Sequence, residues 1–266
     1  MMIPRYIWPT LLLLCAPMSW SFSALISPPR VEGQQHAGKT YRNVLEITNS
    51  SDMNEKYVFK TADWSLDPQG GVLFQDTLAA GSCRPWVSIQ SHEISLKPNQ
   101  RLRYRFEVKV PADAPAGECR FAIMVEGEPQ TPKGGIGLPV SGQIGVIVYL
   151  AIGDAKADVQ FVQAQTQAPQ PKQPPLPSLT FNNQGLAHAR LSGMIEGIDA
   201  KQQRIVFNPS SDPILPQTSR AIVLYPVTEK DLPAPTIAYP LSLKGVLEND
   251  QQEVPIDVVI EPKTAP

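Results

Sequence analysis

The chain is poor in charge, histidine and cysteine, and each scarcity narrows the classes of protein that it can be. Only 18% of its 266 residues are charged and the formal net charge is −2, so no basic excess attracts nucleic acid. The three histidines, His36, His92 and His188, lie far apart, and none has a cysteine or second histidine at metal-ligand spacing. We therefore expect no metal, no cofactor and no nucleic-acid partner.

The sequence also lacks the common signatures of catalysis. It contains no G-x-S-x-G and no H-E-x-x-H motif. The glycines of residues 134–137 do not stand in the strand–turn–helix context that a phosphate-binding loop needs. Carboxylates are scattered over turns and polar faces of the expected strands. We therefore expect a protein that is not an enzyme.

One apolar run lies at the start of the chain, and its features are those of a targeting segment. Residues 7–18 are mainly apolar, follow one cation, Arg5, and precede the small residues Ser19, Ser21 and Ser23. Prolines interrupt the run, and it falls short of the roughly 20 apolar residues that a membrane span needs. The sequence predicts a signal peptide over residues 1–23, with an uncleaved anchor as the alternative. No later segment is long and apolar enough for membrane insertion of the mature chain.

What the chain has in quantity is proline, glycine and apolar residues. Its 28 prolines and 17 glycines disfavour helices, whereas 42% hydrophobic content argues against general disorder. The protein should be globular and rich in strands. Because one β-sandwich needs only about 100 residues, a chain of this length predicts two domains.

The clearest strand signal lies in the stretch of residues 101–127. Apolar side chains at Leu102, Tyr104 and Phe106 alternate with charged ones, the period of a strand with one buried face. A Pro/Gly corner then leads into a second alternating run from Phe121. Two antiparallel strands of this kind need a second sheet to cover their apolar faces.

Strand signals recur along the rest of the chain at roughly the 8 to 12 residue spacing of immunoglobulin-like domains. In the first half we expect about seven strands, including a first strand over residues 24–31 and a longer one over residues 85–96. The predicted fold is all-β, with two immunoglobulin-like β-sandwiches. Their expected bounds are residues 24–152 for the first and residues 153–266 for a smaller second sandwich.

Two cysteines remain once the signal peptide and its Cys15 are removed. Cys119 opens the strand after the Pro/Gly corner, and Cys83 precedes the strand-like run at residues 85–96. In an exported protein such a pair is a candidate disulfide, and two independent thiols are the alternative.

The longest uncharged stretch after the signal peptide covers residues 136–152. Ile136, Leu138 and Val140 alternate with small residues, and a second apolar alternation begins at Ile144 and Val146. One interpretation is a last core strand that is buried on both faces. The other is an exposed apolar edge strand, which a protein normally avoids unless the strand pairs with a partner.

Several short motifs resemble, in their order, a known family. They are Pro-Pro-Arg at residues 28–30, Thr-Ala-Asp-Trp at residues 61–64, Leu-Lys-Pro-Asn-Gln at residues 96–100 before an arginine-bearing strand, and the long apolar strand that leads to a second domain. In this order the chain resembles the periplasmic pilus-assembly chaperones of the chaperone/usher pathway, the PapD-like proteins. It looks like a divergent member of that family.

The resemblance implies a function and a set of site residues. In that family an arginine on the first strand and a lysine on the last strand hold the C-terminal carboxylate of a pilus subunit, and apolar residues of the last strand complete the subunit's fold. The arginine matches Arg30, but no lysine matches, since the strand offers only Gln143 at its polar positions. The implied subunit-binding residues are Arg30, Ile136, Leu138, Val140, Ile144 and Val146. The earlier three should be donors, and the later two should divide between donor and core roles.

Two functions from different classes remain open at this stage. The first is a periplasmic chaperone that caps pilus or fimbrial subunits by donor-strand complementation and passes them to an outer-membrane usher. The second is a structural or adhesive two-sandwich protein of the cell envelope, which keeps the same strand in its own core. A chaperone should copurify with coexpressed subunits, and a structural module should not.

Overall fold

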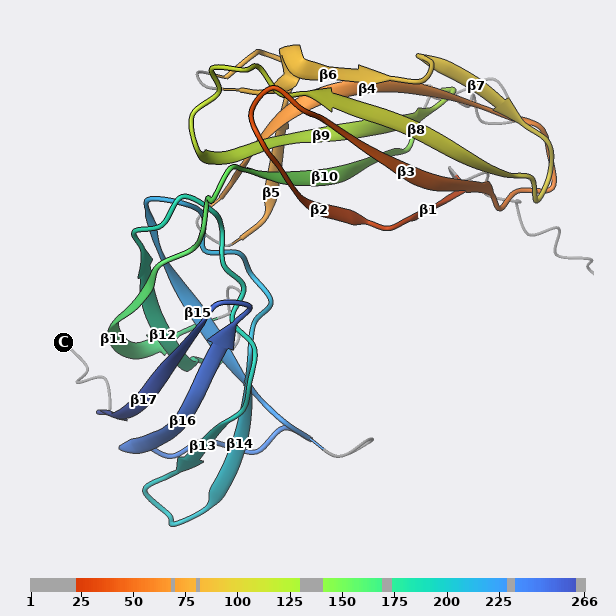
Figure 1. Cartoon of the computed structure of the whole chain (residues 1–266). Helices are drawn as coiled ribbons and strands as arrows, with labels where there is room; N and C mark the ends of the chain where they lie inside the picture. Colours follow the sequence, from red (N-terminus) through yellow and green to blue (C-terminus); the bar gives the residue numbers. More distant parts are fainter. Residues whose placement is uncertain are drawn as a thin grey trace, which may run out of the picture.

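The computed structural model describes residues 23–67, 70–79, 82–129, 141–168, 174–228 and 233–261. These residues form strands and one short 3-10 helix, Arg84–Trp86 (η1), arranged as two β-sandwich units (Figure 1). The predicted all-β class with two sandwich domains is therefore confirmed. The signal peptide lies outside the described residues except for Ser23, and the domain bounds stay predictions.

The first sheet of the N-terminal sandwich is built around the strand that the sequence predicted most clearly. Its four strands have the order β1-β3-β8-β6. Their bounds are Ala24–Ser27 (β1), Thr40–Asn49 (β3), Arg101–Lys109 (β8) and Val87–Ile89 (β6). On β8 the side chains of Tyr104, Phe106 and Val108 are buried, as their alternation predicts.

The second sheet contains the long apolar strand. Five of its six strands have the order β2-β10-β9-β4-β5, and β7 pairs with the beginning of β4. The bounds are Arg30–Gln35 (β2), Gln143–Ile152 (β10), Gly117–Gly127 (β9), Glu55–Leu66 (β4), Val72–Gln75 (β5) and Glu93–Leu96 (β7).

Aromatic residues join the two sheets across the core. The ring of Phe59 on β4 stacks on Tyr104 of β8 with 4.1 Å between centroids, and Phe121 of β9 meets Phe106 of β8 edge-on at 6.2 Å. All four side chains are at most 3% exposed. Their burial contributes to the hydrophobic core that holds the first sandwich closed.

Two stretches that the sequence predicted as single strands each divide between the sheets. Residues 85–96 become η1, β6 and β7, with β6 paired to β8 in the first sheet and β7 paired to β4 in the second. Residues 24–31 divide into β1 and the start of β2, at the cis Ser27–Pro28 bond. Period-2 patterns record which side chains are buried but not which sheet a strand joins, so both single-strand predictions were wrong.

The C-terminal sandwich is one sheet of seven strands that curls on itself. The order is β11-β12-β15-β14-β13-β16-β17. The bounds are Val159–Gln167 (β11), Leu176–Asn183 (β12), Ile195–Ile198 (β13), Arg204–Pro209 (β14), Thr218–Pro226 (β15), Leu241–Asn249 (β16) and Gln252–Ile260 (β17). The side-chain amide of Gln252 donates to the carbonyl of Val159 and accepts from its N–H, at 2.7 and 2.9 Å, and so ties the first strand to the last.

No helix within the described ranges has the length and apolar character that crossing a membrane would require.

Candidate functional site

The long apolar strand β10 has an open edge at its beginning. On one side it pairs with β9 along its whole length, from Gln143 to Ile152. On the other side β2 runs parallel to it and pairs only from Ile147 onward, where Ile147 faces Arg30. Across residues 143–146, no strand of the described chain occupies that side. The backbone groups on this edge are therefore available to another strand.

The open edge exists because the first strand changes sheets. Its first part, β1, pairs with β3 in the opposite sheet, and only its second part, β2, reaches β10. Arg30 is the first residue of β2 and so stands where the open edge ends. The structure thereby brings Arg30 and the beginning of β10 together, although more than 100 residues separate them in the sequence.

The apolar residues of β10 differ in burial along the strand. Val146, Val148 and Leu150 are fully buried in the core of the first sandwich, whereas Ile144 is only half-buried at its margin. Val146 thus packs in the protein's own core, and Ile144 lies at the open edge. The earlier set, Ile136, Leu138 and Val140, lies outside the described residues.

Arg30 is half-exposed and already has an acidic neighbour. Its Nε lies 2.6 Å from Oε1 of Glu32, two residues further along β2. The same carboxylate oxygen lies 3.5 Å from His188 Nε2 and 3.5 Å from Arg190 Nε, both in the second sandwich. Glu32 therefore links the arginine beside the open edge to the joint between the two sandwiches.

His188, which the sequence analysis excluded only as a metal ligand, forms the centre of that joint. Its Nδ1 lies 2.5 Å from Glu118 Oε2, and its backbone N–H donates to the same oxygen at 2.7 Å. Its ring stacks on Tyr149 of β10 with 3.9 Å between centroids. The His188 side chain is only 11% exposed and that of Glu118 only 2%. The histidine is thus held between two carboxylates of the first sandwich.

Arg190 adds a second contact across the joint. Its guanidinium lies over the ring of Tyr149 at 5.7 Å from the centroid, and Nη2 donates to the Tyr149 hydroxyl at 3.2 Å. Its Nη1 donates to the backbone carbonyl of Ser211. Tyr149, from the middle of β10, is therefore covered by a cation and an imidazole from the second sandwich.

The charges of the joint favour the ionised forms of its members. The hydrogen bond from His188 lowers the pKa of Glu32 to about 2 against the opposing effect of burial, and Arg30 and Arg190 add to the lowering. Burial acts to lower the pKa of His188, but hydrogen bonds to Glu118 and Glu32 outweigh it and leave that pKa above its ordinary value. Both shifts therefore favour an imidazolium at His188 beside an ionised Glu32.

A buried asparagine fixes the loop that carries His188. The side-chain oxygen of Asn183 accepts from the N–H groups of Asp158 and Gly185, and its amide donates to the carbonyl of Ala187 at 2.8 Å. A Cβ at Gly185 would collide with the backbone of residues 156–158, so glycine is required at this turn. These contacts place His188 against the first sandwich.

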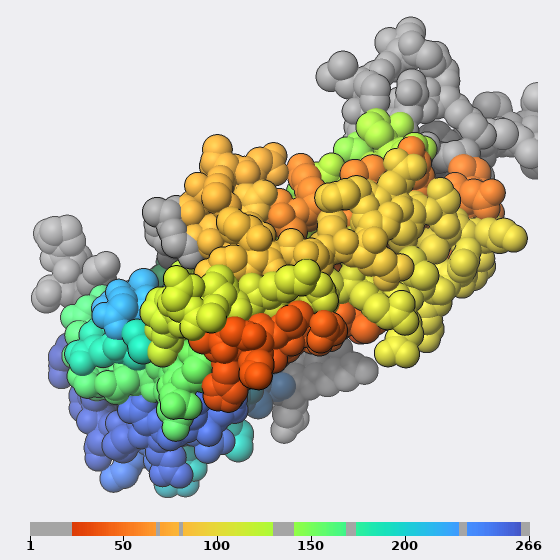
Figure 2. Space-filling model, turned by 45° about the horizontal axis from the view of Figure 1, so that its top comes forward, coloured from red at the N-terminus to blue at the C-terminus, as the bar shows by residue number. Residues whose placement is uncertain are grey.

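A cavity of about 530 Å³ opens beside the joint, between the two sandwiches. Figure 2 shows the red and lime segments of the first sandwich in contact with green and teal segments of the second along this boundary. Its lining includes Glu32, Glu118, Tyr149, His188, Arg190 and Lys156. The sequence had not predicted Glu32, Glu118, Tyr149 or Arg190 as site residues, because their partners lie in a different domain.

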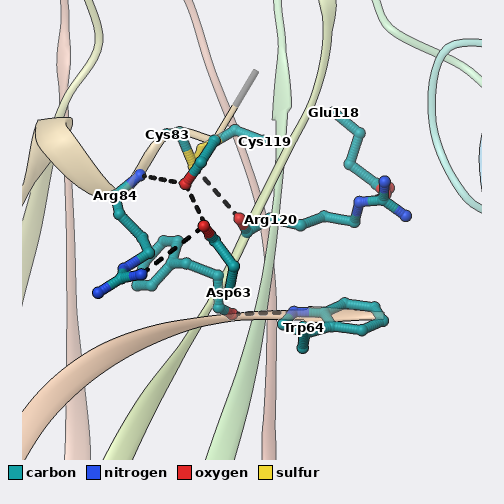
Figure 3. The surroundings of a disulfide bond; sticks show 9 residues. Asp63, Trp64, Cys83, Arg84, Glu118, Cys119 and Arg120 are labelled. Carbon is teal, nitrogen blue, oxygen red and sulfur yellow. Dashed lines mark hydrogen bonds and ion pairs between the residues drawn. A yellow bond between two sulfur atoms is a disulfide. The ribbon is translucent and has the colours of Figure 1, made fainter. Parts of the chain in front are cut away.

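The two cysteines are joined, which confirms the disulfide prediction. Cys83 and Cys119 form a disulfide with 5.6 Å between their Cα atoms, and the bond links the segment before η1 to β9 (Figure 3). Cys119 pairs in the sheet with Leu150 of β10. The disulfide therefore attaches the segment before η1 to the sheet that carries β10.

The Thr-Ala-Asp-Trp motif supports the same region. Asp63 is 3% exposed, and its carboxylate accepts from the N–H of Ala79 at 2.7 Å and from the hydroxyl of Ser82 at 2.6 Å. Its neighbour Trp64 donates from Nε1 to the carbonyl of Phe121 on β9 at 3.2 Å (Figure 3). The motif thus links β4 both to the segment before η1, which carries Cys83, and to β9.

The hairpin of β4 and β5 reaches over the start of β10. The ring of Phe74 on β5 lies against Gly145, where a Cβ would collide with it. The glycine therefore permits this close approach on the outer face of the sheet. Among the described residues, no group of histidine, cysteine and carboxylate side chains could hold a metal ion.

Comparisons with known proteins agree with this architecture. No protein-family sequence profile matches the chain, and no curated protein matches its sequence. A chain in the solved complex of the Salmonella enterica SafA pilin with the SafB chaperone is similar, with a TM-score of 0.50 and 12% identity over 90% of this chain and 98% of that chain. The E. coli chaperone DraB has a TM-score of 0.48 and 13% identity over 90% and 100% of the two chains.

A third solved structure, the class 5 fimbriae chaperone CfaA, has a TM-score of 0.48 and 11% identity over 90% of this chain and all of its own. At these identities the similarity concerns the fold, and it extends over both sandwiches. The chain thus shares its two-sandwich fold with the matched chain of the SafA–SafB complex.

Proposed function

We propose that the protein is a periplasmic chaperone that caps pilus or fimbrial subunits by lending them the strand at the beginning of β10. The observation that carries the proposal is the unpaired edge of β10 over residues 143–146, next to Arg30. An unpaired strand edge readily pairs with a strand of another chain. Among the described residues, no strand pairs with this part of the edge.

The proposed capture is a strand addition. Backbone groups of the open edge hydrogen-bond to the subunit, while apolar side chains at every second position enter its groove. Ile136, Leu138 and Val140 present that spacing in the sequence, and Ile144 continues it at the open edge. Val146 and the residues after it stay in the chaperone's own core and hold the strand in place.

Arg30 is proposed to grip the C-terminal carboxylate of the subunit. A guanidinium can donate two parallel hydrogen bonds to a carboxylate and stays charged at any periplasmic pH. The side chain of Glu32 forms an ion pair with Nε of Arg30, so the C-terminal carboxylate of a subunit would compete with Glu32 for this arginine. Captured subunits would then pass to an outer-membrane usher, and residues 24–152 would form the capturing domain.

The second candidate is a structural or adhesive two-sandwich protein of the cell envelope. It is favoured by the complete burial of Val146, Val148 and Leu150, which shows that most of β10 serves the chain's own core. The two functions differ at residues 136–144, which a structural module does not offer to a partner.

Replacing Arg30 by alanine tests the carboxylate grip. We expect coexpressed subunits to be lost from the purified protein, while the melting temperature changes by no more than about 2 °C, as for a surface substitution. The matched control is Arg42→Ala, which also removes an exposed arginine with one ion pair, to Glu107. If Arg30→Ala and Arg42→Ala recover as much subunit as the wild type, Arg30 does not hold the subunit.

A further inference from the structure

The sheet that faces away from β10 carries a concentration of positive charge on its outer surface. Side chains of β3 and β8 that alternate with the buried residues point outward there. They include five cations and two carboxylates, which are Arg42, Arg101, Arg103, Arg105, Lys109, Glu46 and Glu107. This cationic face contrasts with the formal net charge of −2 for the whole chain.

Three of the five cations are partly neutralised within the face. Arg42 lies 3.2 Å and Lys109 lies 3.5 Å from carboxylate oxygens of Glu107, and Arg101 lies 3.3 Å from Glu46. The other two arginines, Arg103 and Arg105, are exposed and form no ion pair with any described residue. Two guanidinium groups on neighbouring outward positions of one strand are therefore available to anions.

A groove runs beside these arginines. It has a volume of about 620 Å³ and is lined by residues of β3, β6 and β8, together with Gln90. Its lining includes the apolar residue Val44 and the cations Arg42 and Arg105. β3 and β8 lie side by side along this face (Figure 1). The groove combines apolar contact with positive charge.

We propose that the cationic face binds an acidic, extended segment of a partner protein. Alternate residues of a strand stand roughly 7 Å apart, so Arg101, Arg103 and Arg105 match a segment with carboxylates at every second position. Guanidinium and carboxylate groups form strong paired hydrogen bonds. An apolar side chain of the same segment fits the groove beside Val44, which pairs with Arg105.

A protein segment fits this face better than an anionic membrane. Glu46 and Glu107 lie among the arginines and would repel a continuous layer of lipid phosphates, whereas a peptide can place its carboxylates between them. The site is on the sheet opposite to β10, so a subunit on β10 and an acidic partner on this face can be bound together. The inference is therefore independent of the proposed chaperone function.

The test measures binding of two labelled peptides to the purified protein by fluorescence anisotropy at low salt. One peptide alternates glutamate with serine over about ten residues, long enough to follow β8. The other has glutamine in place of each glutamate. The Arg103→Glu and Arg105→Glu double variant removes the face's free cations, and Lys201→Glu with Arg204→Glu makes the same charge change at exposed positions of the second sandwich.

We expect the wild type to bind the glutamate peptide and not the glutamine peptide. The Arg103/Arg105 variant should weaken that binding by about tenfold, and the Lys201/Arg204 variant should leave it unchanged. Equal weakening in both variants would show a general charge effect and overturn the proposal. Binding of phosphatidylglycerol vesicles without binding of the glutamate peptide would also overturn it, since the occupant would then be lipid.

Discussion

Asp63 helps to hold the segment before η1, which carries Cys83. Its buried carboxylate accepts hydrogen bonds from Ala79 and Ser82 and lies 3.7 Å from Nη1 of Arg84. Asp63→Ala removes the acceptor of two donors and should lower the free energy of unfolding by about 3 kcal/mol, measured by urea denaturation.

A second aspartate, Asp76, follows β5 and provides the control for Asp63. Asp76 is 76% exposed and lies 3.4 Å from Nζ of Lys60. Asp76→Ala should cost less than about 1 kcal/mol, because an exposed ion pair contributes little. An equal loss of unfolding free energy in the two variants would mean that the buried hydrogen bonds of Asp63 do not stabilise the segment before η1.

The disulfide itself allows a chemical prediction. Cys83 and Cys119 are 36 residues apart, and closing a loop of this size should contribute about 2 to 4 kcal/mol of stability. Thiol titration of the denatured, unreduced mature protein should find no free thiol, and reduction should lower the urea midpoint. Two free thiols would contradict the bridge.

At the scale of residues, the sequence predicts contacts and side-chain orientation within one strand or turn, but not contacts between distant segments. The alternation around Tyr104 identified its buried face correctly, because side-chain orientation repeats every two residues within one strand. The pairing of Glu118 with His188 could not be predicted, since it spans 70 residues and joins two sandwiches. The signal closest to it was the Asn-Gln-Gly turn at residues 183–185, which marks the loop but not its partner.

At the scale of elements, the joint around His188 predicts a dependence of stability on pH. The pKa of His188 is raised above its ordinary 6.5, so its contribution is full below pH 6.5 and declines as pH rises through the raised value. The pKa of Glu32 is lowered from 4.5 to about 2, so its contribution is full above pH 4.5 and declines toward pH 2. The joint should be strongest between these limits.

His188→Gln provides the measurement, because glutamine keeps a polar side chain and does not titrate. The melting temperature of the wild type should exceed that of the variant by the largest margin between pH 4.5 and 6.5. Above that range the margin should shrink as pH rises and the imidazolium is lost. A margin that grows above pH 6.5 would show that His188 is held as the neutral imidazole.

Strand β10 shows how far an element can be predicted. The sequence indicated a long apolar strand and left open whether it is core or edge. The structure shows both properties within one strand, because β2 covers it only from Ile147 onward. Which portion is covered depends on where the first strand changes sheets. That break falls at Ser27–Pro28, where the chain leaves β3 and then pairs with β10.

At the scale of the whole molecule, length and composition were enough to predict two sandwiches. They could not predict the joint, whose contacts come from β2, β9 and β10 on one side and the His188 loop on the other. Glu32 lies at once beside Arg30 and in this joint. A partner held by Arg30 would therefore act on a residue that also links the two sandwiches.

The most direct test of the chaperone proposal is subunit capture by a Leu138→Asp variant. A pilus subunit is coexpressed with the wild type, with Leu138→Asp and with Leu150→Ala, and each purified protein is examined for bound subunit and for its free energy of unfolding. Leu150→Ala should lose about 2 to 5 kcal/mol, because Leu150 is fully buried in the sandwich core. The account predicts that the wild type retains the subunit, whereas Leu138→Asp folds with nearly unchanged stability and retains none. Unfolding of Leu138→Asp, or its capture of as much subunit as the wild type, would contradict the account.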